Sequence, residues 1–167
     1  EGFTDYYTYL LLLRAKLISL EEYIEHYNTV LDTYYTSSMR YEKNERLINE
    51  FGTDDDLTRL PYQRGQIFAH NLTYMIMKNS FWEKTLDDFM RDLYSRCQNE
   101  SLIVSNGSLS ALIRFYAGDQ ILSEMMRTLN SGIVLKAIPE ALGPCFKMEI
   151  DSYKKLIIFG EQYDVPS

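Results

Sequence analysis

The sequence is poor in histidine and cysteine, which many hydrolytic and metal sites use. Its 167 residues include only two histidines and two cysteines. His26 and His70 are far apart, so they do not form the His-x-x-x-His pair with which one helix holds a metal. There is no Gly-x-Ser-x-Gly turn, glycine-rich phosphate loop or Cys-x-x-Cys pair. These residues alone do not form a complete catalytic site.

Basic residues and long apolar runs are also scarce. The 17 Lys and Arg are outnumbered by 24 Asp and Glu, which gives a net charge of −7. Binding to phosphate groups needs a basic surface, so we expect no nucleic-acid partner. The long apolar run, residues 9–13, is far shorter than the roughly 18 residues that cross a bilayer, so we expect no membrane span.

Two other features have ordinary explanations. Cys97 and Cys145 are compatible with a disulfide, but their spacing favours two separate thiols. The acidic run Asp54-Asp55-Asp56 is compatible with a bound cation, yet it lacks the spacing and the glycine of a calcium loop. We interpret it as a solvated turn.

The composition is that of one globular domain, with 46% hydrophobic residues and 14 tyrosines. Apolar side chains point to more than one face of the expected helix over residues 3–17, as in a helix packed inside a larger body. Ser19 and Glu22 form a capping box that opens a second helix, which should pack against the first as an antiparallel hairpin. Residues 37–60 are polar and predict a long, partly irregular connection, within which Leu47, Ile48 and Phe51 suggest one short helix.

Further helices are predicted from capping and breaking signals. Pro61 stands ahead of a helix over 62–79. Thr85, Ser108 and Asp119 are the expected N-caps of helices that run to about 97, 118 and 130, with Gly132 closing the last one. Residues 139–143 suggest one helical turn, and 146–150 and 156–159 suggest two short strands of a hairpin. The predicted fold is a mainly α, single multi-helix domain over 1–167 with a small C-terminal β hairpin.

Two short motifs are informative when read together. The first is Glu1-Gly2-Phe3-Thr4, and the second, about 60 residues later, is Tyr62-Gln63-Arg64-Gly65. They are followed by Thr85-Leu86-Asp87-Asp88 and by Tyr116-Ala117-Gly118-Asp119. This order resembles the gluzincin metallopeptidases, most closely the glycyl aminopeptidase family. There, a zinc-binding His-Glu-x-x-His helix precedes a helix that opens with Glu-Gly-Phe-Thr.

The resemblance implies a fold and a set of roles. The fold would be like the helical C-terminal subdomain of thermolysin-like metallopeptidases. Glu1 would be the third zinc ligand, and the alternative is a first-turn acid that favours the helix dipole. Tyr62 would donate its hydroxyl to the oxyanion of the tetrahedral intermediate, and the alternative is a core tyrosine. Arg64 would meet a substrate carboxylate or form a structural salt bridge.

Three other residues near these motifs receive supporting roles. Thr4 and Asp5 lie one turn beyond Glu1 and would orient the metal ligands. Gly65 would let its helix approach the zinc-binding helices closely.

The His-Glu-x-x-His helix itself is absent, so two zinc ligands and the general base would lie upstream. We therefore expect a truncated chain, cut just before Glu1 and inactive by itself, with no zinc bound. The parent would be a zinc aminopeptidase acting on peptide substrates. The alternatives are a degenerate relative whose helical domain is a non-catalytic binding module, and a free-standing helical adaptor. A truncated face would leave an apolar or acidic cleft near Glu1 and Tyr62, open to self-association.

Overall fold

The chain is predominantly helical. The computed structural model describes residues 2–99, 102–143, 146 and 148. Over these residues it has seven α-helices, one short 3₁₀ helix (η1) and no strand, in agreement with the predicted mainly α fold. In chain order they are α1 (Gly2–Arg14), α2 (Leu20–Thr36), η1 (Ser38–Tyr41), α3 (Asn44–Glu50), α4 (Asp55–Asn79), α5 (Leu86–Asn99), α6 (Asn106–Ala117) and α7 (Asp119–Ser131).

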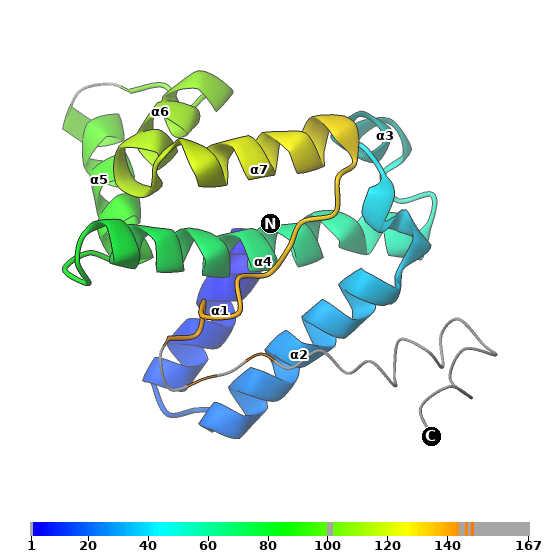
Figure 1. Ribbon diagram of the computed structural model, residues 1–167, viewed down its shortest axis with the longest axis horizontal. Coiled ribbons are helices and arrows are strands. Elements are labelled where there is room, and N and C mark those ends of the chain that lie inside the picture. The colour runs from blue at the N-terminus through cyan, green and yellow to red at the C-terminus, as the bar shows by residue number, and fades with distance from the viewer. Residues whose placement is uncertain (1, 100–101, 144–145, 147, 149–167) are drawn as a thin grey trace.

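Helix α4 is the element on which the others are assembled. In Figure 1 it crosses the molecule, with α7 along one side and α1 and α2 on the other. Helices α5 and α6 lie near its C-terminal end and α3 near its N-terminal end. Because neighbours surround α4, its buried apolar residues are not confined to one stripe: Leu57, Leu60, Ile67, Phe68, Leu72 and Ile76.

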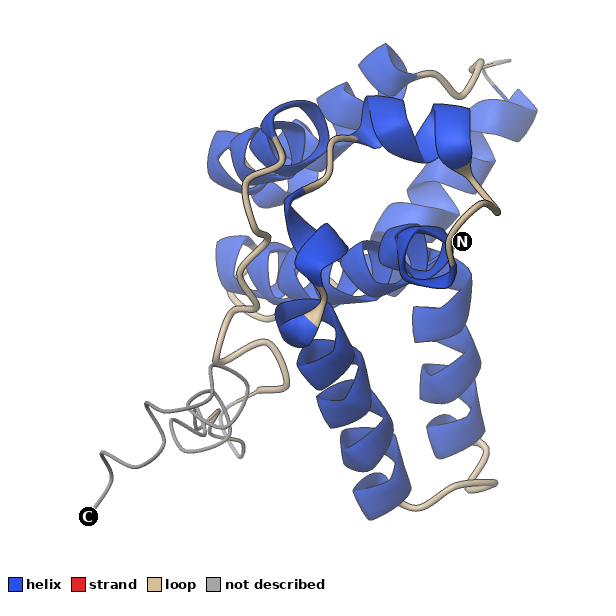
Figure 2. Cartoon of the chain, turned by 90° about the vertical axis from the view of Figure 1, so that its right-hand side faces the viewer, coloured by secondary structure: helices blue, strands red, loops and turns tan. Residues whose placement is uncertain are grey.

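Helices α1 and α2 form the predicted hairpin, which projects from the rest of the molecule (Figure 2). The expected capping box is present at the start of α2. Ser19 Oγ accepts a hydrogen bond from the Glu22 amide at 3.1 Å, and Glu22 Oε2 accepts from the Ser19 amide at 2.7 Å. Two N–H groups that the helix leaves unpaired are satisfied in this way.

The start of α4 was predicted wrongly. The helix begins at Asp55, and Pro61 lies inside it rather than ahead of it. Asp54 is the N-cap, since its Oδ1 accepts from the Leu57 amide at 2.9 Å, and Asp55 and Asp56 occupy the first turn. The acidic run is therefore a helix start that favours the dipole, not a turn. In the connection before it, the expected short helix is present as α3, and η1 is a further helical segment that was not expected.

The later helix starts are close to the predicted ones but not identical. Helix α6 is capped by Ser105, and Ser108 is the third residue inside it, where its hydroxyl accepts from the Ser105 amide at 2.8 Å. Helix α7 has Gly118 at the N-cap position, while Asp119 accepts from Arg114 Nε. At the end of α7, Gly132 is left-handed with φ 68°, as predicted.

The segment after α7 returns across α4 toward α2 (Figure 1). Asn71 on α4 holds it by both ends of its amide, since Nδ2 donates to Lys136 O at 2.8 Å and Oδ1 accepts from the Ile138 amide at 2.9 Å. Turns follow at residues 139–142 instead of a helical turn. Apart from Phe146 and Met148, the predicted hairpin strands lie outside the described residues, as does Cys145. A membrane-spanning helix is not found in the part of the chain that the structure describes.

Candidate functional site

The two motifs meet where α1 crosses α4. The crossing is made by two glycines, Gly2 and Gly65, whose backbones are in contact. A Cβ atom on Gly65 would lie 2.6 Å from Gly2 Cα, closer than real Cβ atoms approach any other atom. A Cβ on Gly2 would lie 2.5 Å from Tyr62 O and would also overlap Gly65 Cα. Only glycine fits at both positions, and the close approach that was predicted at Gly65 is made with Gly2.

This crossing brings the first turn of α1 next to the turn of α4 that carries Tyr62. Tyr62 is partly buried on α4, immediately beside the contact. Glu1, the proposed zinc ligand, lies outside the described residues, so its role remains a prediction. Its sequence neighbour Gly2 is nevertheless in contact with the Tyr62 main chain. The chain has therefore brought together two motifs that are 60 residues apart.

Asp5 lies at the same crossing and contacts a residue that the sequence motifs did not identify. Gln66 Nε2 donates to Asp5 Oδ2 at 3.4 Å, and Gln66 Oε1 and His26 Nε2 are 2.9 Å apart. The ring of His26 stacks on Tyr9, with centroids 3.3 Å apart. The only sequence signal for this group was helical spacing: Gln66 is one turn after Tyr62, and Asp5 is one turn after Glu1. Thr4, the other predicted neighbour of the metal ligands, is exposed.

Arg64 is directed away from this group and into the junction with η1. It is only 4% exposed, and its Nη2 donates to Arg40 O at 3.0 Å and to Glu42 O at 2.7 Å. Burial lowers the pKa of the Arg64 guanidinium, and the nearby Tyr34 hydroxyl and Glu42 carboxylate oppose that shift. These main-chain contacts favour the structural alternative for Arg64, although with carbonyl groups in place of the expected salt bridge.

The described residues do not by themselves fit a zinc ion. No group of three or more His, Cys, Asp or Glu that could hold a metal occurs among them. A catalytic zinc takes three protein ligands, so any such site would need ligands beyond the described residues. No chemical step is therefore assigned to a metal held by the described residues.

Among the described residues, α2 and α3 each carry a surface groove, and neither groove contains Tyr62. One, of about 600 Å³, runs along the outer side of α2 and is lined by Leu20, Glu21, Ile24, Glu25, Asn28, Thr29, Asp32 and Phe146. The other, of about 380 Å³, lies on α3 and the residues before it, and its lining combines Glu42, Glu45 and Glu50 with Lys43 and Arg46. The groove on α2 is acidic, whereas in the groove on α3 Arg46 forms ion pairs with Glu42 and Glu50. The predicted cleft beside Glu1 and Tyr62 stays a prediction.

The N-terminal part of the chain matches a known protein family. Residues 1–54 match the model of the M61 glycyl aminopeptidase family, and no curated protein matches the chain. The match covers α1, α2, η1 and α3, about a third of the sequence, and ends before the Tyr62 motif. For this N-terminal part, the match supports the glycyl aminopeptidase family.

Proposed function

We propose that the chain is the C-terminal, helical part of the catalytic domain of a zinc aminopeptidase of the gluzincin type. The observation that carries this proposal is the Gly2–Gly65 contact, because it joins the family-matched α1 to the Tyr62 motif that lies outside the match. A chance occurrence of both motifs would not require them to meet in space. The fold would then correspond to the helical subdomain of thermolysin-like metallopeptidases.

In this proposal the roles are divided between the chain and the residues upstream of it. Glu1 and two upstream histidines would hold zinc, and an upstream glutamate would be the general base. Tyr62 would donate a hydrogen bond to the negatively charged oxygen that forms when water attacks the peptide carbonyl. The chain by itself would lack the base and two ligands, so it would hydrolyse no peptide and bind no zinc tightly.

The first test is made on the natural polypeptide that contains these residues. Zinc content and release of amino-terminal residues from short peptides would be measured for the intact protein and for the 167-residue chain. The proposal expects one zinc per molecule and hydrolysis only in the intact protein. An intact protein without zinc or hydrolysis would favour the non-catalytic binding module instead, and the chain could then be tested for a bound partner protein.

The second test isolates Tyr62. Tyr62→Phe removes only the hydroxyl, and a positioned donor to an oxyanion is typically worth about 3 kcal/mol, or roughly a hundredfold in rate. We expect kcat of the intact protein to fall by about that factor with zinc content unchanged. Tyr74→Phe, also on α4, is the matched control and should leave kcat unaltered. An unchanged kcat for Tyr62→Phe would mean that Tyr62 is a packing residue and not the oxyanion donor.

A further inference from the structure

The amide of Gln66 lies at the junction of α1, α2 and α4. The residue is 5% exposed, so both ends of the amide need hydrogen-bond partners. Its nitrogen faces Asp5 on α1 at 3.4 Å, and its oxygen faces His26 on α2 at 2.9 Å. One side chain on α4 thus connects polar groups on both helices of the hairpin.

The chemistry of the partners fixes the direction of these hydrogen bonds. An ionised carboxylate only accepts, so the Gln66 nitrogen must face Asp5 and its oxygen must face His26. The oxygen cannot donate, and His26 must therefore carry a proton on Nε2. His26 thus donates a hydrogen bond to Gln66, and Gln66 donates one to Asp5.

His26 is held on a second side by α1. Its ring lies parallel to that of Tyr9, with 6° between the planes and 3.3 Å between the centroids. Tyr9 is one helical turn after Asp5, so α1 contacts both ends of the hydrogen-bonded group. The ring position of His26 and the amide of Gln66 are thereby set by three helices together.

We propose that Gln66 and His26 are positioning residues, which through Asp5 hold the first turn of α1 against the turn of α4 that carries Tyr62. The catalytic meaning of this role rests on the proposed function. Gln66 follows Tyr62 by one turn and Asp5 follows Glu1 by one turn, so their contact joins the turns that carry the proposed oxyanion donor and metal ligand. Loss of such indirect partners costs metalloenzymes about 10–100-fold in activity or metal affinity.

An exchange of donor and acceptor tests the contact. Gln66→Glu keeps an acceptor for His26 but sets a second carboxylate against Asp5. We expect kcat of the intact protein to fall about tenfold or more, with KM changed by less than about twofold. Adding Asp5→Asn restores a donor–acceptor pair in the opposite direction, from the new amide at position 5 to the new carboxylate at position 66. The double variant should recover most of the lost kcat.

The same variants are compared for unfolding by urea in the 167-residue chain, which needs neither zinc nor activity. Gln66→Glu should lower the unfolding midpoint, and the double variant should raise it again. Gln120→Glu is the matched control, because the amide of Gln120 also donates to a carboxylate, Glu124 at 3.2 Å, but on the exposed surface of α7. It should leave kcat unchanged.

The outcomes separate the two proposals. If kcat is unaffected by Gln66→Glu, or if the double variant recovers stability without recovering kcat, the positioning role is overturned while the proposed function stands. If the intact wild-type protein hydrolyses no peptide, the proposed function is wrong, and the Gln66–Asp5 contact then has no catalytic role. Failure of the double variant to recover stability would overturn the contact itself.

Discussion

At the scale of single residues, the helix crossing depends on the absence of two side chains. Gly2 and Gly65 bring the α1 and α4 backbones into contact, and the atoms that a new Cβ would meet are main-chain atoms. Main-chain atoms of two helices cannot rotate away as the end of a flexible side chain can. The overlap must therefore be relieved by moving the whole of α1, which also carries Asp5.

Gly65→Ala is consequently expected to destabilise the fold. Overpacking of this kind costs about 1–3 kcal/mol, more than the roughly 1 kcal/mol that alanine contributes as the better helix former. The control is Gly107→Ala in α6, where the nearest atom to the new Cβ is Ser105 Oγ at 3.7 Å. Urea unfolding of the two variants should show a loss of stability for position 65 and no loss for position 107. Equal effects would contradict the close crossing.

The sequence indicated part of this arrangement at the residue scale. Gly65 was expected to allow a close helix approach, yet nothing in the sequence designated Gly2 as its partner. A glycine at a helix crossing has no periodic signature, because only the backbone that it meets distinguishes it from a glycine elsewhere. Gln66 was missed for a similar reason, since a polar residue on a helix is usually solvent-exposed and its burial depends on the tertiary packing.

At the scale of the elements, the presence and approximate position of most helices could be predicted from local sequence signals. The first residue of several helices could not. The capping box at Ser19 and the left-handed Gly132 were predicted because each is specified by residues in immediate contact. The first residue of α4 was predicted wrongly because a proline is a strong signal for a helix start, and Pro61 pointed to a start later than the one that Asp54 caps. Packing against the helices that surround α4 stabilises a long helix and offsets the cost of one proline inside it.

The position of Pro61 gives a prediction about α4. It is the seventh residue of the helix and has no N–H to donate to Leu57 O. A proline inside a helix destabilises it by about 3 kcal/mol. The same proline lowers the conformational entropy of the unfolded chain, which stabilises the fold by less than about 1 kcal/mol. Pro61→Ala should therefore raise the free energy of unfolding by about 2 kcal/mol in a urea titration. Pro139→Ala, which lies in a turn outside the helices, should show no such gain.

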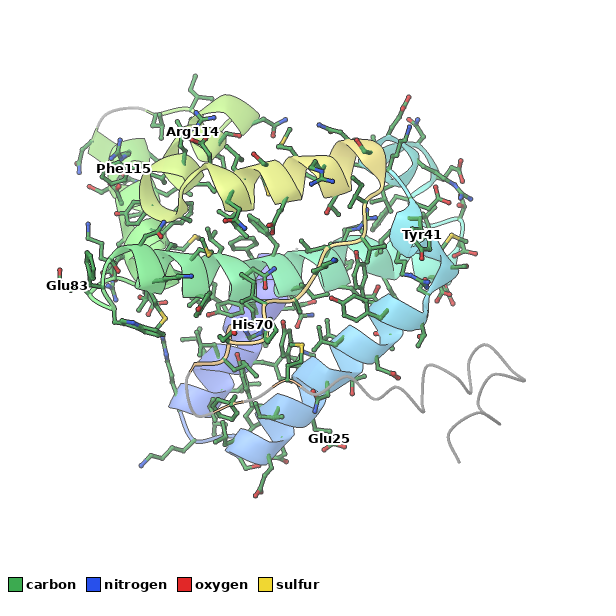
Figure 3. All side chains as sticks on the ribbon, viewed as in Figure 1. Glu25, Tyr41, His70, Glu83, Arg114 and Phe115 are labelled. Carbon is green, nitrogen blue, oxygen red and sulfur yellow. The ribbon has the colours of Figure 1, made fainter. Side chains whose placement is uncertain are left out.

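At the scale of the whole molecule, three helices meet around a buried histidine. His70 lies on α4 near α1 and α2 (Figure 3). It is 5% exposed and contacts tyrosines of both of these helices. Its ring centroid lies 4.8 Å from that of Tyr6, 6.2 Å from that of Tyr23 and 3.9 Å from that of Tyr27. Burial also raises the pKa of these three tyrosines, so they stay neutral and offer no counter-charge to a protonated imidazole.

The position of His70 predicts that the packing of α1 and α2 on α4 weakens in acid. Burial lowers the pKa of His70 to about 3, and the neighbouring His26 shifts it in the same direction. The unfolded chain, with a histidine pKa of about 6.5, then binds the proton more readily than the folded chain does. The stability contribution of neutral His70 is complete above pH ~6.5 and is lost as the pH falls toward 3, by on the order of 4 kcal/mol.

His70→Phe keeps an aromatic ring between the tyrosines but removes the titrating group. Urea unfolding followed between pH 7 and pH 4 should therefore show a smaller loss of stability for this variant than for the wild-type chain. Carboxylates titrate in the same range in both proteins, so the difference between the two curves isolates the histidine. His26→Gln, which alters the more exposed histidine, should leave most of the acid-dependent loss in place. Parallel curves for His70→Phe and wild type would mean that His70 accepts its proton without loss of the fold.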